Sequence, residues 1–211
     1  YYGDVVRVMI LFYLLPVWSV LGGRVFLGEE IDALRMVTLA AAISGGFLIL
    51  GGFQLLSRPP DVIDLIAILS GFAFAMNNLV FRAAQSIPVI SKVTAMFIGV
   101  TIFIGLFLAF DGNAVDMSSP EVTVLAVLYG VGWLTLITFG TQWGVTHLDA
   151  GRASIIIVME LVVAVISSVI ILNQPLSTTE MAGALLVIIA ALLEGAREEK
   201  IEDDNKLAQE A

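Results

Sequence analysis

Cysteine is absent from this 211-residue chain, and histidine occurs once. Without cysteine the chain can form neither a disulfide nor a thiolate metal site. A single histidine cannot supply the H-E-x-x-H pattern of metal hydrolases, so the sequence calls for no metal and no other cofactor. Basic residues are also scarce: the chain has ten lysines and arginines but nineteen acids, a formal charge of −9. This balance argues against a nucleic-acid partner.

Charged residues make up only 14% of the chain and hydrophobic residues 59%, whereas soluble domains have about 25% and about 45–50%. A helix rises about 1.5 Å per residue, so about 20 apolar residues cross a hydrocarbon layer about 30 Å thick. In lipid, each backbone amide must be satisfied within its own helix. The sequence therefore predicts an all-α, polytopic membrane protein embedded in the lipid bilayer. Its seven apolar stretches run near 5–27, 33–56, 62–86, 89–110, 121–146, 153–173 and 179–196.

The two ends of the chain differ from these stretches. Residues 197–211 contain six acids, three bases and few apolar residues, which predicts a disordered, acidic, cytoplasmic tail. The chain begins Tyr-Tyr-Gly-Asp, without a methionine or a signal-peptide pattern. This start predicts an N-terminally truncated part of a longer protein.

An internal repeat links the two ends of the apolar region. With a shift of 145 residues and no gaps, residues 4–38 align with residues 149–183, and seven of these 35 positions are identical. The helix ends and a short polar hairpin, at 28–32 in one copy and 173–177 in the other, also fall in register. Chance alignment of apolar helices is the alternative interpretation.

The same offset predicts three further helices before residue 1, and hence two repeats of five helices. Residues 1–58 would then be the last two helices of the first repeat, and residues 59–196 the second repeat. An odd number of spans inserts the second copy upside down, and inverted repeats are a recurring architecture of transporters. The sequence therefore predicts part of a ten-helix inverted-repeat bundle.

Basic residues predict the orientation of the chain. Cytoplasmic loops carry an excess of lysine and arginine, and only Arg7 and Arg58 lie on one set of loops and helix ends. The hairpin at 28–32 and the C-terminus, on the opposite set, are therefore expected in the cytoplasm, in a multi-pass protein of the plasma or inner membrane. The eight basic residues of that set are Arg24, Arg35, Arg82, Lys92, Arg152, Arg197, Lys200 and Lys206.

Short motifs in the two copies resemble a known family. The first copy has Leu14-Leu15-Pro16-Val17-Trp18 followed by Gly28-Glu29, and the second has Met159-Glu160-Leu161-Val162-Val163 followed by a hairpin and Gly183. These stretches resemble the EamA-type half-repeat of the drug/metabolite transporter superfamily, and the helix order is similar throughout the apolar region. The resemblance implies a ten-helix basket with a central cavity that moves small metabolites by alternating access.

The chain departs from the family pattern at two places. Leu161 stands where the family has proline after the glutamate, so the kink that proline causes is expected to be lost. Asn173 and Gln174 replace the Gly-Glu of the hairpin. The second repeat is therefore expected to move less than the family's, or differently.

Polar side chains at membrane depth are the candidate substrate-binding residues, because burying them in a span is costly and usually marks function. Glu160 lies about eight residues into its helix, on a stripe with small residues. It could take up a proton or hold a cationic substrate, and a structural role for a neighbouring helix is the alternative. Asn77 and Asn78 suit either substrate contact or hydrogen bonds between helices. Arg82 lies near a helix end, where an anchoring role competes with substrate binding.

Helix 121–146 carries the remaining candidates. Thr138 and Gln142 lie on one stripe of this helix, and Tyr129 and Trp133 lie on another. The four side chains either line a cavity for the metabolite or pack in the core. Glycine pairs elsewhere let helices approach closely, within the protein or in a homodimer.

Taken together, these features predict a secondary transporter of a small metabolite, working by alternating access. Efflux is the expected direction, and protons are one candidate for the coupling ion. The alternatives are a non-transporting scaffold or sensor and, less consistent with the sequence, an intramembrane enzyme. An enzyme with a serine nucleophile would need His147 deep in the membrane, and it lies at a helix end.

Overall fold

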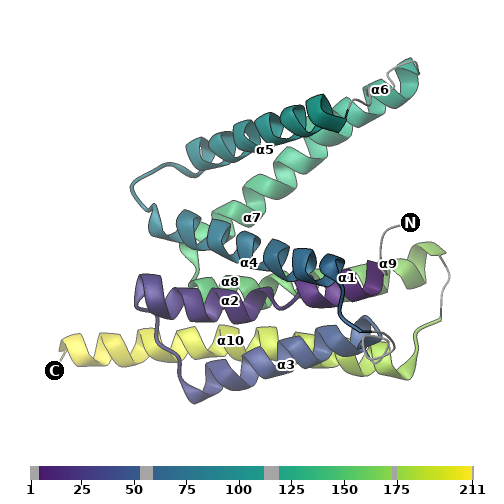
Figure 1. Ribbon diagram of the computed structural model, residues 1–211. Helices are drawn as coiled ribbons and strands as arrows, with labels where there is room; N and C mark the ends of the chain where they lie inside the picture. Colours follow the sequence, from purple (N-terminus) through teal and green to yellow (C-terminus); the bar gives the residue numbers. More distant parts are fainter. Residues whose placement is uncertain (1–4, 53–58, 112–118, 173–174, 211) are drawn as a thin grey trace. The chain divides into compact units, whose positions relative to one another are not determined.

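The computed structural model describes residues 5–52, 59–111, 119–172 and 175–210. All regular secondary structure in these residues is helical (Figure 1), which confirms the predicted all-α, polytopic membrane protein. Predictions made for Arg58, Asn173 and Gln174 fall outside the described residues. The helical segments long and apolar enough to span a membrane are Arg7–Leu27, Val62–Ala83, Val89–Phe110, Pro120–His147, Ala150–Ile171 and Thr178–Arg197.

The remaining predicted span, 33–56, contains a shorter helix, α3 (Ala33–Ile49). Its 17 residues measure about 26 Å at about 1.5 Å per residue. Asp32 begins the helix, because its carboxylate accepts a hydrogen bond from the backbone N–H of Arg35. Gly51 follows its end with φ +67°, a left-handed conformation that glycine adopts without strain. Of the stretch predicted at 33–56, residues 33–49 form this helix, and residues 53–56 lie outside the described residues.

The chain divides into two compact units. Unit 1 comprises residues 1–79 and 148–211, and unit 2 comprises residues 80–147. Unit 1 contains α1 (Val5–Phe12), α2 (Leu15–Gly22), the π-helical η1 (Gly23–Leu27), α3, most of α4 (Val62–Ala83), α8 (Ala150–Ile157), α9 (Met159–Leu172) and α10 (Thr178–Glu210). Unit 2 contains the end of α4, then α5 (Val89–Asp111), α6 (Pro120–Val127), the π-helical η3 (Leu128–Leu134) and α7 (Thr135–His147).

Within unit 1, α3 and α10 pack side by side along most of α3 (Figure 1). Two glycines allow the close approach. A Cβ on Gly45 would lie 2.7 Å from the carbonyl oxygen of Gly183, and a Cβ on Gly183 would lie 2.6 Å from that of Gly45. The expectation that small residues bring helices together is therefore confirmed for Gly45, within the chain itself.

The core of unit 1 lies beside this helix pair. Its buried side chains come from the junctions α1–α2 and α8–α9, from α9 and α10, and from the end of α3. They are Tyr13, Ile49, Val158, Leu161, Val162 and Val187. The core therefore packs the two junctions against α3 and α10.

Helix α10 extends to Glu210, whereas the composition of residues 197–211 predicts a disordered tail. The helix continues because this segment is rich in glutamate, lysine, alanine and leucine, which have high helix propensity. Arg197, the first residue of the predicted tail, is buried rather than solvated, with 6% of its surface exposed.

In unit 2, α5 and α7 contact each other, and polar side chains join the ends of the helices. The buried amine of Lys92 donates to the carbonyl oxygens of Phe81 and Ala84, at 2.7 and 3.2 Å, and to the hydroxyl of Thr146, at 3.0 Å. These bonds satisfy carbonyl groups at the end of α4 that have no partner within the helix. Most apolar side chains of α5, α6 and η3 are exposed, as expected for helices that face lipid.

Candidate functional site

Two helical spans of unit 1 are interrupted at corresponding positions of the repeat. The first span breaks at Tyr13 and Leu14, between α1 and α2, and the second at Val158, between α8 and α9. The offset of 145 residues that aligns the two copies places Val158 opposite Tyr13. Discontinuous helices near the middle of the membrane are typical of substrate sites in transporters.

Proline causes the first break. Pro16 has no N–H, so it cannot bond to the carbonyl of Phe12 one turn earlier, and Val17 instead donates to the carbonyl of Leu14, three residues back, at 2.9 Å. The freed carbonyl of Phe12 faces Gly71 of α4. A Cβ on Gly71 would lie 2.5 Å from that oxygen, so the backbone of α4 can approach the break only because residue 71 is glycine.

The second break occurs without a proline. Here Leu161 donates to the carbonyl of Val158, again three residues back, at 3.0 Å. The helix is thus interrupted at Val158 although Leu161 stands where the family has proline. Glu160 consequently lies in the first turn of α9, directly after the break, rather than inside a continuous helix.

A hydrogen bond connects the two breaks. The hydroxyl of Tyr13 donates to Oε1 of Glu160, across 147 residues of sequence. Tyr13 is buried, with 6% of its surface exposed, whereas Glu160 is exposed. Within the described residues, Oε2 of Glu160 has no hydrogen-bond partner. Tyr13 was not among the predicted site residues, although its position three residues before Pro16, where a helix break is expected, could have indicated it.

A cavity of about 210 Å³ adjoins the first break. Helix α1 and the break form one wall, and α3 forms the other. The only polar side chain in its lining is that of Tyr13. The lining residues are Ile10, Leu11, Tyr13, Leu14, Ala42, Ile43, Gly46 and Phe47.

The two asparagines of α4 also lie in unit 1. Asn78 is almost fully buried, with 1% of its surface exposed, whereas Asn77 is half-buried. The amide of Asn77 donates to Oδ1 of Asn78 at 3.4 Å, and Nδ2 of Asn78 has no partner among the described residues. A buried amide donor without a partner costs about 1–3 kcal/mol. Asn78 is therefore the better candidate of the two for contact with a bound molecule.

The other predicted residues belong to unit 2. Arg82 donates to the carbonyl oxygen of Thr146 at 3.2 Å, a contact at a helix end that fits its interpretation as an anchor. Tyr129 and Trp133 lie in the π-helical η3 and are each 56% exposed. Thr138 is half-buried. Gln142 is 2% exposed, and its Oε1 has no partner in the part of the chain that the structure describes.

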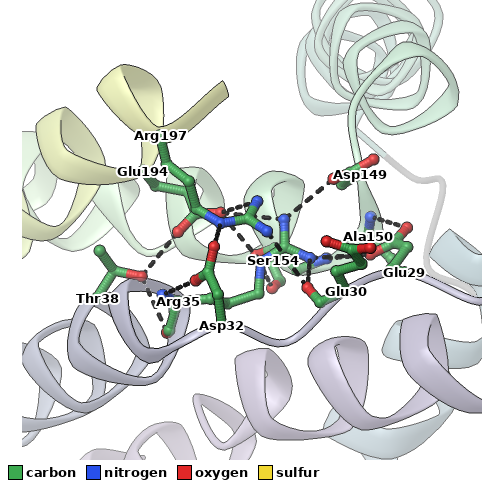
Figure 2. A network of polar contacts seen from close by, with 11 residues as sticks. Glu29, Glu30, Asp32, Arg35, Thr38, Asp149, Ala150, Ser154, Glu194 and Arg197 are labelled. Carbon is green, nitrogen blue, oxygen red and sulfur yellow. Dashed lines mark hydrogen bonds and ion pairs between the residues drawn. The ribbon is translucent and has the colours of Figure 1, made fainter. Parts of the chain in front are cut away.

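The largest polar network of unit 1, which we call the hairpin cluster, was not predicted (Figure 2). Arg35 of α3 is its centre, with 1% of its side chain exposed. Its guanidinium contacts carboxylate oxygens of Glu194 and Asp149 at 3.1 Å each, and of Glu29 at 3.3 Å. The cluster comprises Glu29, Glu30, Asp32, Arg35, Thr38, Asp149, Glu194 and Arg197, from the hairpin, α3, α10 and the residue before α8.

A second arginine closes the cluster. Arg197 of α10 donates to Asp32 at 2.7 Å and lies 3.6 Å from Glu194. Glu194 has no exposed side-chain surface and also accepts a bond of 2.7 Å from the hydroxyl of Thr38. Buried carboxylates are tolerated when they are paired and hydrogen-bonded in this way.

The hairpin also caps α8. Gly28 turns the chain with φ +72°, and the carboxylate of Glu29 then accepts the N–H groups of Ala150 and Gly151, at 2.7 and 3.4 Å. Burial raises the pKa of the Glu29 carboxyl, although these N–H groups and Arg35 act in the opposite direction. Burial also acts to raise the pKa of Asp32, but the N–H of Arg35 and the guanidinium of Arg197 outweigh it and hold this pKa below its ordinary value.

A separate ion pair lies near the starts of α1 and α4. Arg7 binds Asp64 through two bonds of 2.6 Å, and the two side chains are 5% and 7% exposed. Arg7 begins the span Arg7–Leu27, and the residues of the hairpin that belong to the hairpin cluster follow its end. Unit 1 therefore has a buried ionic contact at each end of this span.

The arrangement can bind and release a polar group at the helix breaks. Within the described residues, no group of three or more histidine, cysteine, aspartate or glutamate side chains could hold a metal ion. The carboxylate of Glu160 and the hydroxyl of Tyr13 can exchange hydrogen bonds with a substrate without covalent chemistry.

Comparison with known proteins identifies the family of the chain. The model of the EamA-like transporter family matches residues 62–194, from the start of α4 into α10. The match covers Glu160 and every other predicted site residue. No curated protein matches the chain. Because the matched region is more than half of the chain, the resemblance found in the sequence is confirmed: the chain belongs to the EamA-like transporter family.

Proposed function

We propose that the protein is a secondary transporter that moves a small metabolite across the membrane by alternating access, with the substrate bound at the two helix breaks. The bond between Tyr13 and Glu160 is the observation that carries this proposal. It places a titratable carboxylate beside two interrupted helices, the arrangement by which transporters expose polar groups at membrane depth.

The positions of the helices support two inverted repeats. Helix α3 begins at Ala33 and α10 at Thr178, again 145 residues apart. In a two-fold arrangement each contact recurs with the roles of the copies exchanged. Thr38 bonds to Glu194, and the corresponding residues are Gly183 and Ile49. These two also touch, because a Cβ on Gly183 would lie 2.9 Å from the side chain of Ile49.

Alternating access requires helices to part first at one end of the site and then at the other. The Arg7–Asp64 pair and the hairpin cluster join helices at opposite ends of the span Arg7–Leu27. We assign the two contacts to the two closed states: one opens while the other stays formed. We propose efflux with proton exchange at Glu160, with the 28–32 hairpin and the C-terminus in the cytoplasm.

Metabolite profiling tests the proposal. Cells that overproduce the full-length protein should export at least one metabolite faster than cells that lack it. The variant Glu160→Gln, at equal expression, should lower this export at least tenfold and remove its dependence on pH. Glu121→Gln is the matched control, because Glu121 is an exposed acid in the first turn of α6. Metabolite levels that do not depend on the protein would contradict the proposal and favour the scaffold or sensor.

A further inference from the structure

We propose that Glu160 and Tyr13 recognise a small amine whose apolar body occupies the cavity between α1 and α3. The inference rests on the proposed function and names the chemical class of the substrate. Three observations support it: Glu160 lacks a cationic partner among the described residues, the lining of the cavity is apolar, and the volume of the cavity is small.

Glu160 has no cationic partner in the part of the chain that the structure describes. Its one hydrogen bond there comes from a neutral hydroxyl, that of Tyr13. The arginines of unit 1 with known partners bind other acids: Arg7 binds Asp64, and Arg35 and Arg197 bind within the hairpin cluster. A carboxylate at membrane depth is stable only when it is neutralised or paired. An ammonium group supplies the missing charge and donates to the free oxygen, Oε2.

The cavity selects what the ammonium group is attached to. Seven of its eight lining residues have no polar side-chain atom, and the eighth is Tyr13. A hydrocarbon chain or ring gains about 25 cal/mol for each Å² of apolar surface that it buries there. Sugars, phosphates and amino acids would instead lose hydrogen bonds to water that these side chains cannot replace.

The volume sets an upper limit on the substrate. Pockets for drug-sized ligands measure about 300–1,000 Å³, whereas this cavity measures about 210 Å³. A branched aliphatic chain or a single ring is of suitable size, and a multi-ring organic cation is too large.

Tyr13 connects the two parts of the site. Tyr13 is one of the residues that line the cavity, and its hydroxyl donates to Oε1 of Glu160. Tyr13 is thus a positioning residue: it directs the second oxygen of the carboxylate to the amine while the apolar body contacts the ring. Ile43, on the α3 wall, contacts only the apolar body.

Calorimetric binding to the full-length protein in nanodiscs tests the inference with three probes of similar shape: 3-methylbutan-1-amine, 3-methylbutan-1-ol and 3-methylbutanoate. The amine should bind at least tenfold more tightly than the alcohol or the acid. Equal affinity for the amine and the alcohol in the unaltered protein would overturn the proposal, and this comparison needs no variant.

Variants then locate the site. Glu160→Gln should weaken amine binding at least tenfold, Tyr13→Phe should weaken it about fivefold, since one hydrogen bond contributes about 1 kcal/mol, and Ile43→Phe should abolish it by filling the cavity. Glu121→Gln should leave it unchanged. Undiminished amine binding by Glu160→Gln would overturn the proposal.

The outcome is separable from that of the proposed function. If export depends on the protein but the amine does not bind, the amine proposal fails and the transporter remains. If the amine binds but no metabolite is exported, the site remains and the transporter fails.

Discussion

Arg35 of α3 and Glu194 of α10 form an ion pair of 3.1 Å in which neither side chain has more than 1% of its surface exposed. Asp149, Glu29 and Thr38 surround the pair, so every charged group in it has several hydrogen-bond partners. Burying two charges costs several kcal/mol per ion, which such partners offset. The pair joins α3 and α10, the two helices that correspond in the proposed repeats. Loss of either charge would leave the other buried without its partner and would weaken the contact between these helices.

Removing one member of this pair should destabilise the protein strongly. Arg35→Met leaves Glu194 charged and buried without its main partner, which costs about 3–5 kcal/mol. The thermal unfolding of the full-length variant in detergent should therefore occur at a clearly lower temperature. Arg24→Met is the control, because Arg24, in the preceding π-helical segment η1, is exposed. Equal unfolding temperatures for the two variants would contradict the prediction.

Asp32 should make a small contribution to stability that disappears in acid. Its pKa in the fold lies below the ordinary value, so the ionised carboxylate stabilises the fold above the unfolded pKa of about 3.9. This stabilisation is lost as the pH falls through the lower pKa of the folded state. Its side chain is 42% exposed, which limits the effect to about 1 kcal/mol or less.

The measurement is the difference in unfolding temperature between the unaltered protein and Asp32→Asn. The unaltered protein should be more stable at pH 7, and the difference should shrink towards pH 3. A difference that stays constant over this range would contradict the prediction, because the ionised carboxylate would then add nothing to stability. Glu121→Gln is the control, since Glu121 is exposed.

Gly183 should tolerate no side chain, whereas another glycine of the same helix should. Alanine at residue 183 would place its Cβ 2.6 Å from the carbonyl oxygen of Gly45, so α3 and α10 must separate. Overpacking of this kind costs about 1–3 kcal/mol. A Cβ on Gly195 meets nothing within 4 Å. Gly183→Ala should therefore lower the unfolding temperature, and Gly195→Ala should not. The opposite order would contradict the close contact of the two helices.

The fold was predictable because the length and apolarity of the spans depend on the residues of each span alone. The substrate-binding role of the candidate residues remains a prediction, because neither the fold nor the family match assigns a role to a single side chain. These residues are Asn77, Asn78, Arg82, Tyr129, Trp133, Thr138, Gln142 and Glu160.

The partners of these residues were not predictable. Tyr13 and Glu160 are 147 residues apart, and nothing in the local sequence of either indicates the other. Arg35 was counted as one of many basic residues at helix ends, where solvation is the usual expectation. Its burial depends on Glu194, which follows 159 residues later. The break at Val158 has no proline to indicate it, and only the register of the repeat places it opposite Tyr13.

The absence of cysteine from this chain makes its orientation testable by labelling single cysteines in a full-length protein that has no others. Ser177 and Glu30 are both exposed, and they belong to hairpins that the proposed inversion places on opposite sides of the membrane. Ser177→Cys should react with a membrane-impermeant maleimide in intact cells, whereas Glu30→Cys should react only after permeabilisation. This expectation rests on the excess of basic residues around the 28–32 hairpin.

An odd number of spans between equivalent hairpins is what inverts the second copy, so labelling of both sites from the same side would refute the inverted repeats. Labelling of Glu30→Cys alone in intact cells would keep the inversion but reverse the orientation of the whole protein.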